Sequence, residues 1–137
     1  MDHTDYLDDE DRLLPRGPLS MQGRRVYLFS IENLLAIVEE KQYREFVWPS
    51  EGTWNENGDF IFHEGSYVDE KTGTEIPYPE APLMVDMQSA NAFRIIYDAV
   101  NEKNKAKLRD YSLEHRGLFV WVMNDLVWPN ISFGGSK

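Results

Sequence analysis

The chain has 137 residues, a length typical of one domain that buries a sizeable core without disulfide or metal support. An apolar share of 42% argues against global disorder, and the absence of cysteine excludes disulfides and cysteine-based metal sites. A net charge of −10 argues against nucleic acid or an anionic membrane surface as the partner, because both attract basic proteins.

Residues 1–22 are predicted to form an acidic, flexible arm, and residues 23–137 a single α+β domain. Two interpretations of the arm stay open, a solvated tail and a docking arm that orders on a partner. In the second interpretation the contacts are made by carboxylates, namely Asp5, Asp8, Asp9, Glu10 and Asp11. No apolar signal segment opens the chain, so we expect a cytoplasmic protein, in the cytoplasm of a bacterial host.

The next segments predict a strand, a helix and two hairpins. Residues 24–29 alternate as a short strand, and Ser30 then caps a helix that we expect to end between Lys41 and Glu45. Asn57-Gly58 favours a two-residue type I′ turn, since that turn requires positive φ at both central residues. A second hairpin is expected across residues 71–73, and a short extended segment over residues 83–87.

The remainder predicts a pair of helices. One is expected to start near Ser89 and to break at residues 101–104. The other, residues 113–128, is the most apolar segment, with Ser112 as its N-cap and Trp121 in the core; it is too short and too polar to cross a membrane. Strands followed by helices predict an α+β fold, a small antiparallel sheet with about three helices packed on one face.

No catalytic, metal-binding or nucleotide-binding motif is recognisable. The histidines, His3, His63 and His115, lack metal-ligand spacing, and the sequence contains neither a Gly-x-Ser-x-Gly elbow nor a phosphate-cradling glycine loop. We therefore expect no enzyme activity, no metal and no cofactor. The basic residues between Lys103 and Arg109 are interpreted as a solvated turn rather than as a grip for phosphate.

Two tryptophans, Trp48 and Trp54, flank the predicted loop 49–53 and stand beside Glu51 and Glu56. An exposed aromatic pair among carboxylates has the composition of a binding hot spot. The competing interpretation is ordinary packing of the loop against the core, which would bury the rings.

The run Met87-Gln88-Ser89-Ala90-Asn91-Ala92-Phe93, followed by residues 97–101 and 104–108, resembles stretches in short uncharacterised proteins of bacteriophages and other bacterial mobile elements. These are helix-packing patterns, and the final helix with its aromatic end is similar in placement. The resemblance implies no activity and carries over no functional residue. It implies a setting: a small acidic accessory protein of an element that must survive in a host.

These features predict a non-enzymatic, acidic protein-binding module of a phage or mobile element. It would occlude a basic, nucleic-acid-binding surface of a host-defence protein such as a CRISPR effector or a restriction enzyme, with carboxylates in the place of phosphates. Its partner-binding residues would be the five arm carboxylates with Trp48, Glu51, Trp54 and Glu56. One alternative is an immunity or antitoxin protein that neutralises a basic toxin. Another is a small enzyme or ligand-binding domain with a pocket between sheet and helices. The oligomeric state is left open.

Overall fold

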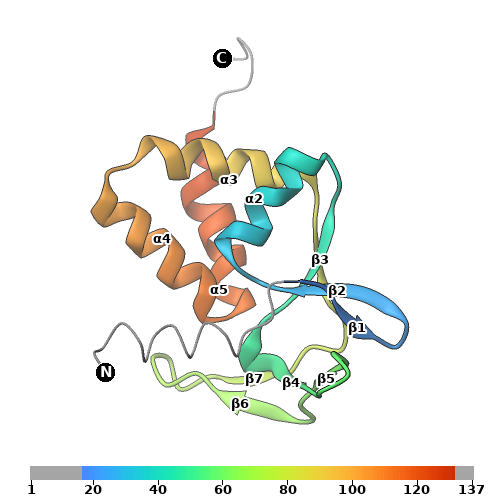
Figure 1. Ribbon diagram of the computed structural model, residues 1–137. Helices are drawn as coiled ribbons and strands as arrows, with labels where there is room; N and C mark the ends of the chain where they lie inside the picture. The colour runs from blue at the N-terminus through green and yellow to red at the C-terminus, as the bar shows by residue number, and fades with distance from the viewer. Residues whose placement is uncertain (1–16, 132–137) are drawn as a thin grey trace, which may run out of the picture.

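A four-stranded sheet with helices against one face organises residues 17–131, the part of the chain that the computed structural model describes (Figure 1). The predicted α+β class is confirmed. The sheet has the order β1-β2-β3-β8, with strands Leu19–Met21, Arg24–Leu28, Arg44–Val47 and Leu83–Val85. Two separate hairpins follow β3 in sequence: β4 (Gly52–Trp54) with β5 (Phe60–Phe62), and β6 (Ser66–Val68) with β7 (Glu75–Pro77). The α-helices are α2 (Ile31–Glu40), α3 (Met87–Ala99), α4 (Glu102–Glu114) and α5 (Arg116–Trp121).

The central strands β2 and β3 run parallel, with Tyr27 opposite Phe46 and Leu28 opposite Val47. The predicted antiparallel sheet therefore contains one parallel pair, because α2 forms the crossover connection that parallel strands require. The outer pairs, β1 with β2 and β3 with β8, are antiparallel. Since Leu19–Met21 forms strand β1, the arm predicted over residues 1–22 extends too far into the fold.

Helix α2 begins and ends where its sequence predicts. The Ser30 hydroxyl accepts a hydrogen bond from the Asn33 N–H at 3.0 Å, which satisfies one of the donors exposed at the start of a helix. Leu34 and Ile37 are fully buried on its inner face. Lys41 ends the helix in the left-handed conformation, with φ of 58°.

The two predicted hairpins are present, but the first turn differs from its prediction. Asn57 does not have positive φ; only Gly58 does, at 81°. The turn is a longer loop from Asn55 to Asp59, because the Asn55 side chain accepts hydrogen bonds from the N–H groups of Asn57 and Asp59. A short polar side chain that satisfies the turn backbone replaces the type I′ geometry.

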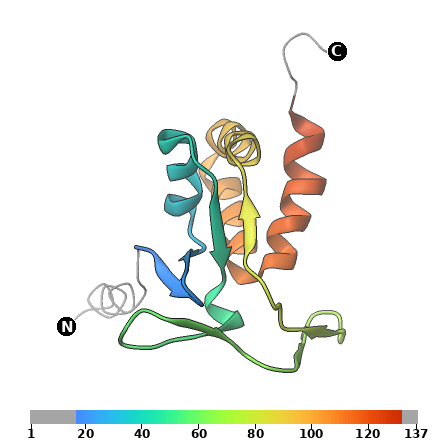
Figure 2. The same ribbon diagram turned by 90° about the vertical axis from the view of Figure 1, so that its right-hand side faces the viewer.

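The sheet separates two clusters of buried side chains. Along β2 and β3, Tyr27 and Phe46 face the helices, whereas Val26, Leu28 and Val47 face the β4–β5 hairpin. The cluster on the helix side contains Trp48, Phe93 and Phe119, and the smaller cluster on the hairpin side contains Phe60. The two views at right angles place the hairpins together at the end of the molecule away from α3 (Figures 1 and 2).

The last part of the chain is divided differently from its prediction. Helix α4 continues to Glu114, so Ser112 is not an N-cap but a fully buried residue inside α4. His115 is extended, with φ of −164°, and its Nδ1 accepts from the Leu118 N–H to cap α5. A π-helical segment, η2 (Val122–Val127), and a 3₁₀ turn, η3 (Trp128–Asn130), follow. Trp121, predicted to lie in the core, is 42% exposed, while Val122 and Val127 are buried.

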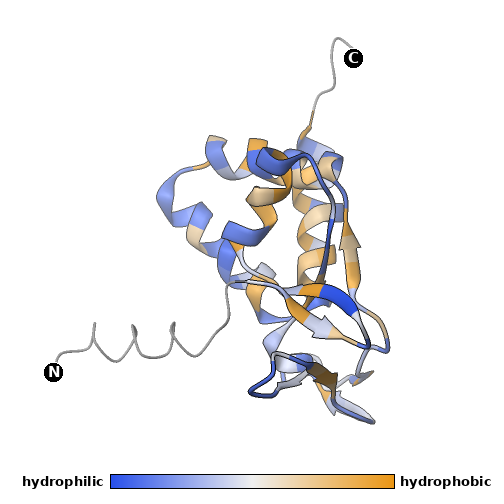
Figure 3. Cartoon of the chain, turned by 45° about the vertical axis from the view of Figure 1, so that its right-hand side comes forward, coloured by the Kyte–Doolittle hydropathy of each residue, from blue (hydrophilic) through white to orange (hydrophobic). Residues whose placement is uncertain are grey.

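Hydropathy differs sharply between the two last helical stretches (Figure 3). The stretch from α5 through η2 is largely apolar, whereas α4 is largely hydrophilic and buries only Leu108 and Ser112. Within residues 17–131 no helix combines the length and the hydropathy that crossing a bilayer requires.

Candidate functional site

The predicted partner-binding residues within the described part of the chain do not share one environment. Asp5, Asp8, Asp9, Glu10 and Asp11 lie outside the described residues. The other four lie within them, and the structure does not gather them into one exposed patch. Trp48 and Glu51 are buried, Trp54 is half-buried and Glu56 is exposed.

Trp48 is a core residue and not an exposed hot spot. It directly follows β3, lies on the helix side of the sheet and has no exposed surface. Its ring stacks on Phe29 with centroids 4.6 Å apart and an interplanar angle of 8°. Its indole N–H donates to the backbone carbonyl of Ser112 at 2.8 Å, which ties β3 to α4. A buried indole needs such a partner, and here the partner is a helix backbone.

Glu51 is also buried, with 3% of its surface exposed, and it is paired inside the protein. One carboxylate oxygen accepts from the Trp48 backbone N–H at 2.9 Å. The Arg116 guanidinium donates to both carboxylate oxygens and to the carbonyl of Ala81 at 3.0 Å. We refer to Trp48, Glu51, Ser112 and Arg116 as the Trp48 joint, since they connect β3, the end of α4 and the start of α5.

Trp54 and Glu56 belong to the first hairpin. The Trp54 ring stacks on Phe60, with centroids 6.4 Å apart, and packs against the smaller core. Trp48 and Trp54 therefore lie in different cores and form no pair. Glu56 lies exposed in the loop between β4 and β5, where it makes no hydrogen bond or ion pair within the described residues.

Aromatic and imidazole rings connect the second hairpin to the α4–α5 junction. Tyr67 lies 5.0 Å from Tyr78 and 6.5 Å from His115, and His63 lies 5.1 Å from Tyr78, all measured between ring centroids. Burial raises the pKa of Tyr67 above its ordinary value of 10.0, and the carboxylates of Glu51 and Asp69 act in the same direction. Tyr67 is therefore a neutral phenol at neutral pH, and the cluster connects the hairpin to the helices.

The hairpins carry the most one-sided charge in the described chain. Between residues 56 and 80, seven carboxylates accompany a single cation, Lys71: they are Glu56, Asp59, Glu64, Asp69, Glu70, Glu75 and Glu80. We call residues 52–80 the acidic hairpin lobe. Two of its carboxylates serve the hairpins, since Asp69 accepts from the Lys71 N–H and Glu75 accepts from the Ser66 hydroxyl. Four others are exposed and form no hydrogen bond or ion pair within residues 17–131: Glu56, Glu64, Glu70 and Glu80.

The acidic hairpin lobe was not among the predicted binding residues, because the prediction rested on the acidic arm and on the total charge. A count of charge along the chain would have found it, since the carboxylates from residue 56 to residue 80 are nearly uninterrupted by cations. The ring cluster had no such signal, because His63 and His115 lie far apart in sequence and come together only in the folded chain.

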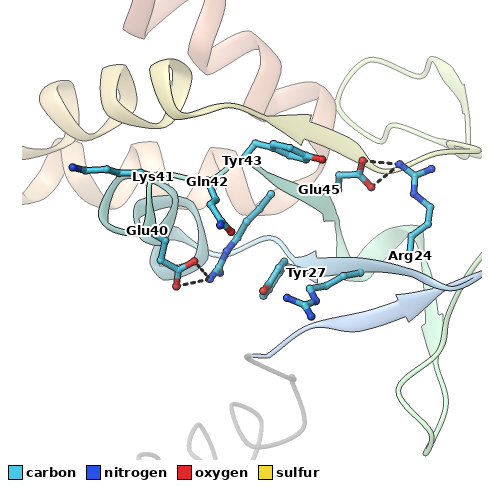
Figure 4. A pocket seen from close by; sticks show the side chains of 9 residues that line it. Arg24, Tyr27, Glu40, Lys41, Gln42, Tyr43 and Glu45 are labelled. Atoms are coloured by element: carbon cyan, nitrogen blue, oxygen red, sulfur yellow. Dashed lines mark hydrogen bonds and ion pairs between the residues drawn. The ribbon is translucent and has the colours of Figure 1, made fainter.

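Cations gather elsewhere, on α4 and around a concavity at the amino ends of β2 and β3 (Figure 4). We call it the basic concavity. It has a volume of about 740 Å³ and is lined by Arg24, Arg25, Tyr27, Glu40, Lys41, Gln42, Tyr43, Arg44 and Glu45. A second, more apolar groove of about 480 Å³ lies between α3, α4 and η2. Within residues 17–131 no group of three or more His, Asp or Glu side chains is arranged to hold a metal ion.

Comparison with known proteins adds no relative: no family model matches the chain, and neither a curated protein nor a solved structure matches it.

Proposed function

We propose that this protein is a non-enzymatic inhibitor that binds a basic protein through its acidic hairpin lobe. The observation that carries the proposal is the segregation of charge, with seven carboxylates and one lysine between residues 56 and 80. A patch of one sign attracts a partner of the opposite sign, speeds its encounter and fixes its orientation.

The carboxylates of the lobe are available to a partner, unlike the carboxylate of Glu51. Glu56, Glu64, Glu70 and Glu80 are exposed and unpaired in the described part of the chain. The four cations of α4, Lys103, Lys105, Lys107 and Arg109, share that helix with Glu102, Asp110 and Glu114, and two of them form ion pairs there. A basic partner is therefore drawn to the hairpin end rather than to α4.

Exposed apolar side chains lie among these carboxylates. Ile61 on β5 is 61% exposed and Val68 on β6 is 60% exposed. Interfaces obtain much of their affinity from apolar contacts surrounded by a polar rim, while charge contributes orientation and association rate. The lobe supplies both kinds of contact on two short hairpins.

The partner that suits this surface is a protein that normally binds nucleic acid, because its basic groove is built to hold a row of phosphates. In the bacterial setting implied by the resemblance to mobile-element proteins, we propose a host-defence protein such as a CRISPR effector or a restriction enzyme. The lobe carboxylates would occupy the positions of phosphates, and the carboxylates of residues 1–16 would add to the same attraction.

The test is competition with DNA. Immobilised full-length protein is exposed to a bacterial lysate at low salt, and proteins released by a salt step are identified and purified. Each is then mixed with duplex DNA and increasing amounts of this protein in a gel-mobility assay. We expect this protein to displace the DNA and an excess of DNA to displace this protein, because the two compete for one basic surface.

A partner that binds DNA and this protein at the same time would contradict occlusion. Capture that does not weaken as salt rises would contradict the electrostatic contact, and so would the absence of any captured nucleic-acid-binding protein.

A further inference from the structure

The basic concavity has the opposite charge to the protein as a whole and belongs to neither the lobe nor the joint. Four cationic side chains line it, against two carboxylates: Arg24, Arg25, Lys41 and Arg44, against Glu40 and Glu45. Figure 4 shows Arg24 directed at Glu45 on one side of the concavity, and Glu40 and Lys41 at the end of α2 on the other.

Two of the cations are already paired. Arg24 donates to both carboxylate oxygens of Glu45, at 2.7 and 2.6 Å. Arg44 donates to Glu40 at 2.9 Å and to Asn33 at 2.9 Å, and its guanidinium lies 3.9 Å from the centre of the Tyr27 ring. These contacts hold Arg44 in place and leave 11% of its side chain exposed, while its Nε–H makes no hydrogen bond within residues 17–131.

The other two cations, Arg25 and Lys41, are exposed and have no hydrogen-bond or ion-pair partner within residues 17–131. Arg25 also faces a like charge. Continued by two residues, the parallel register that sets Tyr27 opposite Phe46 sets Arg25 opposite Arg44 on the same face of the sheet. Like charges on neighbouring strands repel, and Glu40, the ion-pair partner of Arg44, offsets only one of the two.

We propose that the basic concavity is an oxyanion site that holds the phosphate group of a small phosphorylated ligand between Arg25 and Arg44. Lys41 is directed away from them and adds only to the positive potential around the site (Figure 4). A doubly charged phosphate supplies the counter-charge that Arg25 lacks within residues 17–131. Arginine binds phosphate through paired N–H groups.

The volume of the concavity supports a ligand larger than a free ion, since pockets for small molecules range from about 300 to 1,000 Å³. The rival oxyanion is a carboxylate of the chain itself. Residues 1–16 carry six carboxylates and join the described chain just before β1, which pairs with the strand that bears Arg25. The two sources share one chemistry, so the experiment has to distinguish them.

The experiment is a titration of isotope-labelled full-length protein, followed through the backbone amide signals. Inorganic phosphate and adenosine monophosphate are the two probes, each compared with sodium chloride at equal ionic strength. We expect saturable shifts confined to residues 24–27 and 40–45. Arg25→Gln should weaken binding about tenfold or more, because it removes hydrogen bonds to a charged group. Lys103→Gln, which removes an exposed cation from α4, is the matched control and should bind like the wild type.

Thermal unfolding gives a second readout that a purely structural arginine would not produce. Arg25→Gln should be as stable as the wild type or more stable without phosphate, and phosphate should raise the Tm of the wild type and not of this variant. A full-length variant with Asp8→Asn, Asp9→Asn, Glu10→Gln and Asp11→Asn separates the sources. Phosphate binding that appears only in this variant assigns the site to the carboxylates of the chain in the native protein.

The proposal is overturned if neither the wild type nor the arm variant shows a saturable shift beyond that of chloride. Equal phosphate affinity in Arg25→Gln and the wild type would overturn it as well. Adenosine monophosphate binding that equals phosphate binding would place the recognition in the phosphate group, as proposed. Binding of phosphate without adenosine monophosphate would overturn the assignment to a phosphorylated ligand.

Discussion

Glu51 and Glu56 lie close together in the sequence, yet one belongs to the Trp48 joint and the other to the acidic hairpin lobe. Glu51 is buried, forms an ion pair with Arg116 and accepts a hydrogen bond from the Trp48 backbone N–H. Glu56 is exposed and unpaired within residues 17–131. The difference shows that the contacts a carboxylate makes in the folded chain decide whether it stabilises the fold or is available to a partner. Loss of charge in the joint should therefore destabilise the fold, and loss of charge in the lobe should weaken binding.

The largest expected effect separates the two tryptophans. Trp48→Ala should lower the free energy of unfolding by about 3–5 kcal/mol, since it empties a fully buried aromatic site and removes the hydrogen bond to Ser112. Trp54→Ala should cost clearly less, because Trp54 is only half-buried in the smaller core. Urea unfolding followed by circular dichroism measures both, and equal losses would show that the joint is no more central than the hairpin.

The next effect concerns the ion pair. Glu51→Gln should lower the free energy of unfolding by about 3 kcal/mol, because it leaves the Arg116 guanidinium without its counter-charge in a mostly buried site. Glu56→Gln, the same change on the lobe, should alter stability by less than about 0.5 kcal/mol. Chemical denaturation of the two variants is the measurement. A negligible effect of Glu51→Gln would remove the distinction between joint and lobe.

A smaller effect of opposite sign tests Ser112. Its hydroxyl is buried without a hydrogen-bond partner in the described residues, which costs free energy. Ser112→Ala should therefore leave stability unchanged or raise it by up to about 1 kcal/mol. An N-cap serine would behave in the opposite way, since its loss costs about 1 kcal/mol. Destabilisation of the alanine variant in thermal unfolding would support the cap that the sequence predicted.

The smallest expected effect lies at the contact between the regions. The pKa of Tyr67 is raised by burial and by nearby carboxylates, so the folded state holds the phenolic proton more tightly than the unfolded state. This contribution to stability is complete below about pH 10 and disappears as the pH rises through the folded-state pKa. Tyr67→Phe should reduce the loss of stability above about pH 10. Unfolding curves at neutral and alkaline pH measure this loss. If the free energy of unfolding falls equally steeply with pH in the wild type and in Tyr67→Phe, Tyr67 does not contribute to the alkaline loss of stability.

Local signals in the sequence were sufficient for parts of the fold. The Ser30 cap, the apolar stripe of α2 and the two hairpins were predicted because each depends on neighbouring residues. The parallel pairing of β2 and β3 was missed, since pairing depends on where α2 returns the chain. The helix boundary at His115 was missed because an imidazole caps α5 in place of the more usual serine or aspartate.

The candidate site was predicted less well, because its residues acquire their roles through distant contacts. Nothing near Glu51 in the sequence indicates that Arg116 will meet it, and nothing near Trp48 indicates the carbonyl of Ser112. A hot spot at residues 48–56 was a reasonable interpretation of the composition alone. The charge of the lobe, in contrast, is a local property and could be read from the sequence.

The most direct measurement compares two triple variants of equal charge as bait for the same captured partner. The lobe variant is Glu56→Gln, Glu64→Gln and Glu70→Gln, and the control is Glu39→Gln, Asp98→Asn and Asp125→Asn, which removes exposed carboxylates from the helical side. Both should unfold like the wild type. Affinity for the partner and its dependence on salt should fall steeply for the lobe variant and little for the control. Equal affinities of the two variants would show that only total charge matters and that the acidic hairpin lobe is not the docking surface.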